Sequence, residues 1–129
     1  MSKQALIVDD EKEVRLVWVA LAQDCGLEVT EASDGREATE LLKSDAAFDL
    51  IILDQIMPFV SGAEVLKFIR ETERLKNIPV ILSTASRATQ SLGDIPADQL
   101  TSYVNKAAGI EKLRRAITQV LGTEDNDPE

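Results

Sequence analysis

The sequence predicts one α/β domain in which a five-stranded parallel sheet carries helices on both faces. Three observations support this prediction. Short apolar runs alternate with segments that repeat apolar residues at helical spacing, an order typical of parallel α/β sheets. The 129 residues have the size of one domain and can bury enough surface to fold without disulfides or metals. Neither an internal repeat nor a Ser/Gly-rich linker divides the chain.

Five short apolar runs are expected to form the strands. The run at 50–53 has four consecutive large aliphatic residues, which suits a strand that is buried on both faces. Polar or turn-forming residues end each run, as expected for strands that lead into loops. The five runs are 5–8, 27–32, 50–53, 80–82 and 103–105.

The segments between these runs show the apolar spacing of helices. Asp34 is expected to cap the second helix, after the turn at Asp34-Gly35. Residues 87–92 allow barely two turns before Gly93 and Pro96, so the fourth helix is expected to be short or irregular. The residues expected to face the core are Val14, Val17, Trp18 and Leu21 in the first helix; Ala38, Leu41 and Leu42 in the second; Val65, Leu66 and Ile69 in the third; and Ile110, Leu113, Ala116, Ile117, Val120 and Leu121 in the last.

Composition excludes several classes of function. The 14 basic and 23 acidic residues give a net charge of −9, which argues against a nucleic-acid-binding surface. The chain has no histidine, which excludes Ser-His-Asp chemistry and histidine metal sites. Its single cysteine, Cys25, cannot form an internal disulfide, and no run approaches the roughly 20 apolar residues of a membrane span. We therefore expect a cytoplasmic domain over 1–122, followed by a disordered acidic tail at 123–129.

Polar residues stand where the predicted strands end. They are Asp9 and Asp10, Asp54, Thr84 and Lys106. Ligands of doubly wound sheets bind outside the carboxyl ends of the strands, so these side chains are expected to share one crevice. Carboxylates this close repel one another unless a cation lies among them, and their oxygens suit Mg²⁺. A cation and a lysine beside an aspartate favour phosphoryl transfer onto that carboxylate.

The spacing of these residues resembles that of the receiver domain of two-component response regulators. Asp10 precedes Asp54 by 44 positions, Thr84 follows it by 30, and Lys106 follows Thr84 by 22. The run from Asp54 to Pro58, with Gly62 after it, also matches. The resemblance extends from Gln4 to about Leu121. It implies a flavodoxin-like sheet with strand order 2-1-3-4-5 and a Mg²⁺-dependent phosphoacceptor switch that is not an enzyme in the usual sense.

The resemblance also implies a role for each matching residue. Asp54 would accept the phosphoryl group. Asp10 and Asp54 would bind Mg²⁺ directly, together with the backbone carbonyl of Ile56, while Asp9 would act through water. Thr84 would donate its hydroxyl to the phosphoryl group. The alternative interpretation of Asp9 and Asp10 is that they cap the first helix.

Two further residues near the end of the predicted sheet take roles from the resemblance. Lys106 would form an ion pair with the phosphoryl group, although the family usually has proline where Ala107 follows it. Tyr103 would be the switch aromatic whose rotamer follows Thr84, unless it serves packing alone. Ile56 and Ser86 occupy the positions that tune hydrolysis. Because Ile56 has no polar group to orient a water molecule, we expect a long-lived acyl phosphate.

The first predicted helix has more apolar residues than its core face needs. Leu16, Val19 and Ala20 lie at i, i+3 and i+4, which predicts a second apolar stripe. This stripe is either a set of scattered surface residues or a docking patch for a histidine kinase or histidine phosphotransfer protein.

The function expected from the resemblance is a receiver that takes a phosphoryl group from a partner's phosphohistidine and then binds an unidentified downstream protein. Two alternatives remain open: an interaction module that works without phosphate, or a receiver excised from a larger regulator. An aspartate-nucleophile phosphatase commonly has a second aspartate two residues after the first, where this chain has Ile56. A flavin-binding module would need a phosphate loop where Asp9-Asp10-Glu11 stands, and negative charge there would repel phosphate.

Overall fold

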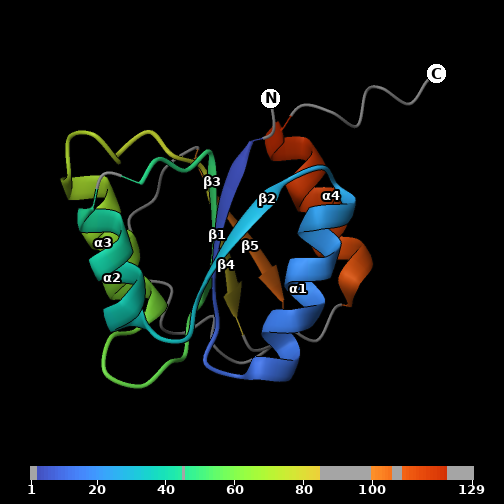
Figure 1. Ribbon diagram of the computed structural model, residues 1–129, viewed down its shortest axis with the longest axis horizontal. Coiled ribbons are helices and arrows are strands. Elements are labelled where there is room, and N and C mark those ends of the chain that lie inside the picture. The colour runs from blue at the N-terminus through green and yellow to red at the C-terminus, as the bar shows by residue number, and fades with distance from the viewer. Residues whose placement is uncertain (1–2, 45, 85–99, 106–108, 122–129) are drawn as a thin grey trace.

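The computed structural model describes residues 3–44, 46–84, 100–105 and 109–121. They form a parallel sheet of order β2-β1-β3-β4-β5 with α1 and α4 on one face and α2 and α3 on the other (Figure 1). This confirms the predicted fold class and strand order. The expected irregular helix at 87–92 and the acidic tail lie outside the described residues, and the helix labelled α4 is the last one that the structure describes. The elements are β1 (Gln4–Val8), α1 (Lys12–Asp24), β2 (Glu28–Ala32), α2 (Gly35–Lys43), β3 (Leu50–Asp54), α3 (Gly62–Glu71), β4 (Val80–Thr84), β5 (Thr101–Asn105) and α4 (Ile110–Leu121).

The strands supply side chains to two separate hydrophobic clusters, one on each face of the sheet. Successive residues of a strand point to opposite faces, so Leu6 and Val8 of β1 belong to one cluster and Ala5 and Ile7 to the other. The first cluster, called here the α2/α3 core, also holds Leu66. The second, the α1/α4 core, contains Trp18, Leu21, Leu50, Ile52, Ile81, Leu113 and Ile117. Strands buried on both faces explain the continuous apolar runs in the sequence.

Helices α2 and α3 begin at side-chain caps. Asp34 accepts a hydrogen bond from the backbone N–H of Glu37 at 2.9 Å, which confirms the predicted cap of α2. At α3, Ser61 accepts from the N–H of Glu64 at 3.2 Å, and the Glu64 carboxylate accepts from the N–H of Ser61 at 2.9 Å. This reciprocal capping box satisfies two backbone donors that the first turn of a helix leaves without partners.

The prediction for the faces of α1 was wrong at two positions. Trp18 and Leu21 are buried as expected, but Val17 is 47% exposed. Val19, assigned to the second apolar stripe, is instead half-buried and packs against the α1/α4 core. Both residues flank the buried face of the helix at similar angles, so the spacing alone does not decide between them. Val29 of β2 packs against the same core as Val19, whereas Val17 lies on the flank toward α4.

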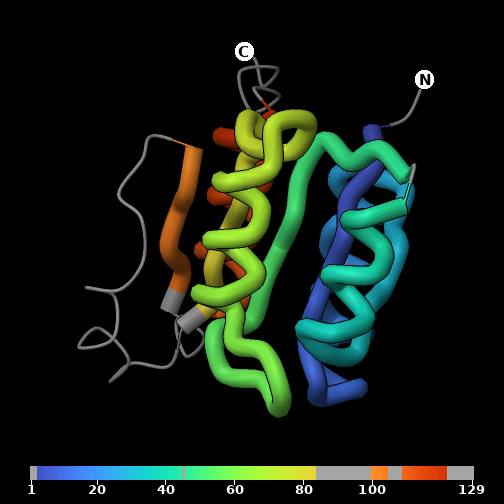
Figure 2. The backbone as a smooth tube through the Cα atoms, turned by 90° about the vertical axis from the view of Figure 1, so that its left-hand side faces the viewer, coloured from blue at the N-terminus to red at the C-terminus, as the bar shows by residue number. Residues whose placement is uncertain are grey.

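The carboxyl ends of the strands meet at one edge of the sheet. In Figure 2 this is the lower edge, where the chain leaves β1 toward α1 and leaves β3 toward α3. The register pairs Val8 with Leu53, and Asp54 with Ser83. Residues that directly follow β1 therefore lie beside the last residue of β3. Topology thus brings Asp9 and Asp54, which are far apart in the sequence, to the same edge.

Candidate functional site

Three carboxylates converge at the carboxyl edge of the sheet. Asp9 and Asp10 follow β1, and Asp54 is the last residue of β3. One carboxylate oxygen from each lies within 4.8 Å of the others. Asp9 is fully buried and Asp54 is 3% exposed, while Asp10 faces solvent. The structure therefore brings together the three acids that the sequence singled out.

The backbone around Asp9 holds its side chain in place. Its Oδ1 accepts a hydrogen bond from the N–H of Glu11 at 2.8 Å, a short local turn. The guanidinium group of Arg15 donates to the Asp9 carbonyl at 2.7 Å and forms an ion pair with Glu31 at 2.9 Å. The N-cap of α1 is Glu11, which makes no side-chain capping bond. Neither Asp9 nor Asp10 is thus the N-cap residue of this helix. Arg15 was not singled out from the sequence, because its partners lie on different elements.

The carboxylate cluster has the chemistry of a site for a hard divalent cation. Two buried carboxylates and a third beside them would repel one another strongly if all were ionised without a counter-charge. Their oxygens are the ligands that Mg²⁺ prefers, and Mg²⁺ commonly combines one or two carboxylates with water. The exposed side chain of Asp10 leaves one side of the cluster open to solvent. The donor set therefore fits Mg²⁺.

The residues that follow Asp54 fix its position. The N–H of Gln55 donates to the Ser83 carbonyl of β4 at 2.9 Å, and the Gln55 side chain accepts from the N–H of Ala63 at 2.8 Å. A Cβ atom at Gly62 would lie only 2.4 Å from the Asp54 carbonyl oxygen. Glycine is therefore required where α3 begins against the end of β3. The structural role of the Gln55 side chain was not foreseen, because it depends on the approach of α3.

The other predicted site residues differ in how far the structure describes them. Thr84 is the last residue of β4 and pairs in register with Asn105, although its hydroxyl lies outside the described part of the chain. Lys106 and Ser86 also lie outside it. Tyr103 lies on β5, paired with Leu82, and is 43% exposed. Ile56 lies two residues after the end of β3 and is mostly exposed to solvent.

The predicted apolar stripe on α1 changes in composition. Leu16 and Ala20 are exposed as expected, but the half-buried Val19 leaves the stripe and the exposed Val17 joins it. Ile110, at the start of α4, is also exposed and borders the same region as Val17. The surface formed by Leu16, Val17, Ala20 and Ile110 is called here the α1/α4 apolar surface.

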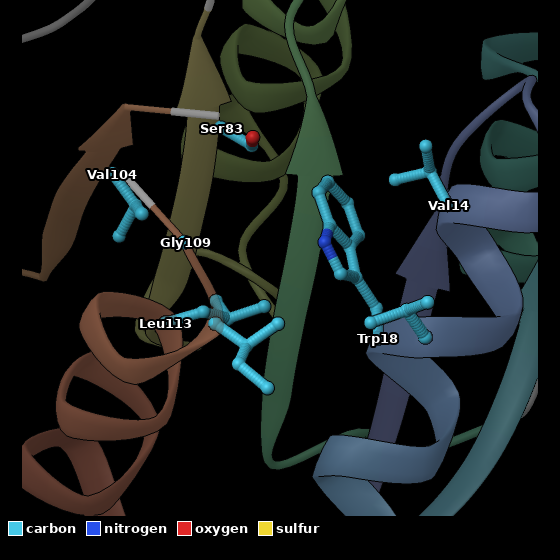
Figure 3. A pocket seen from close by; sticks show the side chains of 8 residues that line it. Val14, Trp18, Ser83, Val104, Gly109 and Leu113 are labelled. Carbon is cyan, nitrogen blue, oxygen red and sulfur yellow. The ribbon is translucent and has the colours of Figure 1, made fainter. Parts of the chain in front are cut away.

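A cavity of about 200 Å³ opens between α1 and α4 beside this surface. Figure 3 shows Trp18 and Val14 on one side of it and Leu113 and Val104 on the other. Ser83 of β4 lies at its wall, and the Ser83 hydroxyl is buried with no hydrogen-bond partner among the residues that the structure describes. The position next in sequence is Thr84, so the cavity lies close to the end of β4.

Of the helices that the structure describes, none has the length and apolar character needed to cross a membrane.

Comparison with known proteins agrees with this geometry. The family model of the response regulator receiver domain matches residues 5–118. The chain is 33% identical over 117 residues to the chemotaxis protein CheY of Pseudomonas aeruginosa, covering 90% of this chain and 94% of that protein. It is 32% identical over 112 residues to the CAI-1 autoinducer sensor kinase/phosphatase CqsS of Vibrio cholerae, covering 86% of this chain but 16% of CqsS.

A solved structure also shares this fold. The response regulator TrrA of Thermotoga maritima, in complex with Mg²⁺ and BeF, has a TM-score of 0.75 to this chain and 31% sequence identity. The likeness covers 92% of this chain and 98% of TrrA. Receiver domains are phosphoacceptor switches rather than enzymes, and a histidine kinase is the source of their phosphoryl group. The chain therefore belongs to the response regulator receiver domain family of two-component signalling.

Proposed function

We propose that Asp54 accepts a phosphoryl group from a phosphohistidine of a partner protein and that the phosphorylated domain then binds a downstream protein. The observation that carries the proposal is the convergence of the carboxylates of Asp9, Asp10 and Asp54 within 4.8 Å. Asp54 is assigned as the acceptor because it ends the central strand β3, with Asp9 and Asp10 grouped beside it, within a chain that belongs to the receiver family. Mg²⁺ is the cofactor that this donor set supports.

The transfer forms one bond and breaks another. An oxygen of the Asp54 carboxylate attacks phosphorus, a P–O bond forms, and the P–N bond to the partner's imidazole breaks with its electron pair on nitrogen. Asp10 and Asp54 would hold Mg²⁺ directly with the Ile56 carbonyl, and Asp9 would do so through water. Bound Mg²⁺ supplies charge neutralisation for the incoming phosphoryl oxygens. The turn at Glu11 and the guanidinium of Arg15 keep Asp9 oriented toward this position.

Thr84, Lys106 and Tyr103 would read out the modification. The hydroxyl of Thr84 and the ammonium of Lys106 would contact the phosphoryl group, and Tyr103 would change rotamer when Thr84 moves. The position of Thr84 at the end of β4 and the partial exposure of Tyr103 on β5 support this assignment. Phosphorylation would then shift an existing equilibrium toward the conformation that the downstream protein prefers.

Treatment with a small acyl-phosphate donor tests the acceptor directly. Mass spectrometry should find one added phosphoryl group on Asp54 of the wild-type protein, formed only when Mg²⁺ is present. Asp54→Asn should abolish the modification, and Asp10→Asn should reduce it while leaving Asp54 available. Glu40→Gln, an exposed acid on α2, is the matched control and should react normally. Modification elsewhere would contradict the proposal, and no modification at all would favour an interaction module that works without phosphate.

The lifetime of the acyl phosphate depends on the groups that can orient water near Asp54. Ile56 is exposed beside the acceptor and offers no hydrogen bond, which supports a long lifetime. Ile56→Asn should speed phosphate loss, and Ile56→Val is the control that leaves the site apolar. Equal or slower loss from the asparagine variant would contradict this assignment. Ser86 is the second position expected to affect the rate.

We further propose that the α1/α4 apolar surface binds the phosphodonor, a histidine kinase or a histidine phosphotransfer protein. The surface combines exposed apolar side chains on both helices, and α1 begins two residues after Asp10, next to the acids in the chain. Leu16→Glu should slow transfer from the protein donor and leave phosphorylation by a small donor unchanged. Glu73→Lys, an exposed charge change outside the α1/α4 apolar surface, is the control. Equal slowing with both donors would instead indicate damage to the acid site.

The site of action is proposed from composition. The single cysteine and the net charge of −9 suit a cytoplasmic signalling domain that acts by binding protein and not nucleic acid. Fractionation of cells that express the full chain would test this. Recovery with the membrane fraction or on DNA would contradict it.

A further inference from the structure

The loop between β3 and α3 contains a turn with an unfavourable backbone conformation. The N–H of Val60 donates to the Pro58 carbonyl at 2.8 Å, which closes a γ-turn centred on Phe59. Phe59 has a φ of 72°, and it is the sole non-glycine residue with positive φ in the part of the chain that the structure describes. Bulky residues rarely adopt this conformation. The Phe59 side chain is 67% exposed, so burial does not hold it there.

A contact from α2 does hold the Phe59 side chain. The guanidinium carbon of Arg36 lies 3.6 Å from the centroid of the Phe59 ring, a cation–π contact. The backbone of α2 also approaches the backbone of the loop closely at this point, because a Cβ atom at Gly35 would lie 2.4 Å from the Val60 carbonyl oxygen. The start of α2 therefore touches the γ-turn through both side chain and backbone.

The γ-turn sets the path of the loop that follows Asp54. Gln55 fixes the base of the loop, because its N–H donates to Ser83 and its carbonyl accepts from Gly62. Met57 is buried in the α2/α3 core and Val60 packs against it. Between these anchors, Ile56, Pro58 and Phe59 are exposed and belong to neither core. Only Met57 and Pro58 separate Phe59 from Ile56, so the γ-turn lies close in the chain to the backbone of Ile56.

We infer that Arg36 is a positioning residue that acts through Phe59 to keep the β3–α3 loop ready for metal binding. This inference rests on the proposed function, because it concerns the Ile56 carbonyl as a Mg²⁺ ligand. The Arg36–Phe59 contact offsets the unfavourable backbone of the γ-turn. Without this contact, fewer molecules have the loop in the conformation that binds metal. The apparent Mg²⁺ affinity falls in proportion to the fraction of molecules that keep that conformation.

Calorimetric titration with Mg²⁺ tests the inference without phosphorylation. Arg36→Gln should weaken Mg²⁺ binding about two- to fivefold, the range that an exposed cation–π contact represents. Arg36→Lys keeps a cation over the ring and should recover part of the loss. The loss of positive charge alone predicts the opposite change in Mg²⁺ affinity, because removing a cation near an acidic site should tighten Mg²⁺ binding. Tighter or unchanged binding would overturn the inference.

Two substitutions at Phe59 separate the contact from general destabilisation. Phe59→Gly removes the backbone penalty, so Arg36→Gln should have no effect on Mg²⁺ affinity in that background. Phe59→Leu keeps the penalty and removes the ring, and should weaken binding as Arg36→Gln does. An effect of Arg36→Gln that persists beside Phe59→Gly would show that Arg36 acts by another route and would overturn the inference.

Amide exchange of Val60 reports on the γ-turn in the absence of metal. Arg36→Gln should speed this exchange, while the exchange of amides in β3 stays unchanged. If the wild-type protein binds no Mg²⁺, the proposed function fails and the role of Arg36 toward the metal fails with it. If the wild-type protein binds Mg²⁺ and the variants match it in both affinity and Val60 exchange, only the inference about Arg36 fails.

Discussion

The two faces of the sheet are built differently. On one face, the α2/α3 core packs buried aliphatic side chains from the strands against two helices that begin at side-chain caps. On the other face, α1 begins without a side-chain cap and the α1/α4 core borders a cavity with an unpartnered hydroxyl at Ser83. Exposed apolar residues line the same side.

The difference fits the proposal that one face of the sheet mainly stabilises the domain while the other binds partners. The residues at the start of α1 orient an acid site, since Asp9 uses the N–H of Glu11 and the guanidinium of Arg15. At the start of α2 and α3, the N-cap residues Asp34 and Ser61 instead stabilise the helix itself. We therefore expect the α2/α3 face to contribute more to folding and the α1/α4 face to tolerate changes that affect partners.

Truncation of a leucine on each face measures this difference. Leu66→Ala in the α2/α3 core should lower the free energy of unfolding by about 4 kcal/mol, near the upper end of the range for buried leucines. Leu113→Ala should cost only about 2–3 kcal/mol, because Leu113 borders a cavity and has fewer neighbours to lose. Leu16→Ala, at an exposed position, is the control and should be nearly neutral. Urea unfolding would measure all three, and equal losses at Leu66 and Leu113 would refute the comparison.

Removal of a cap should affect α3 more than α1. Ser61→Ala deletes one half of the capping box and should lower the free energy of unfolding by about 1 kcal/mol. Glu11→Ala removes no side-chain capping bond, so its cost should not include the roughly 1 kcal/mol of a lost cap. The same unfolding experiment compares them. A larger cost at Glu11 would show that α1 is stabilised at its start in another way.

Ser83 offers the reverse test, a substitution on the cavity side that should not destabilise. Its buried hydroxyl has no partner, so Ser83→Ala removes the cost of an unsatisfied polar group and should be neutral or stabilising by up to about 1 kcal/mol. Thr101→Ala is the contrasting variant, because Thr101 Oγ accepts from Arg70 at 2.9 Å. A clear loss of stability in Ser83→Ala would show that the hydroxyl is bonded in solution.

Cys25 tests the packing at the far end of α1. Burial raises the pKa of its thiol, Asp24 adds to this effect, and the cation of Arg114 opposes it. A raised pKa leaves less thiolate at mildly alkaline pH, so alkylation by iodoacetamide should be slower than for a free cysteine and should speed up on unfolding. Arg114→Gln removes the opposing charge and should slow alkylation further. Reaction as fast as that of free cysteine would contradict the burial of this end of the helix.

The local chemistry of the chain predicted most elements and the acid site. Asp34 caps α2 as expected, because a cap depends on residues three positions apart. Asp9, Asp10 and Asp54 come together because each lies at or just after the end of a strand of the same parallel sheet, and topology places such ends at one edge. The faces of α1 were predicted less well. Val17 and Val19 flank the same buried stripe, and neighbours that are distant in sequence decided which one is covered.

The sequence by itself determined the alternation of strands and helices, the helix caps and the position of each acid at a strand end, because these depend on neighbouring residues and on residue type. Only the tertiary structure decided the close approach of Gly62 to Asp54, the contact of Arg36 with Phe59 and the cavity beside Ser83. These features arise where separate elements meet, and their distances depend on how whole helices pack against the sheet. No pattern within a single element contains that information.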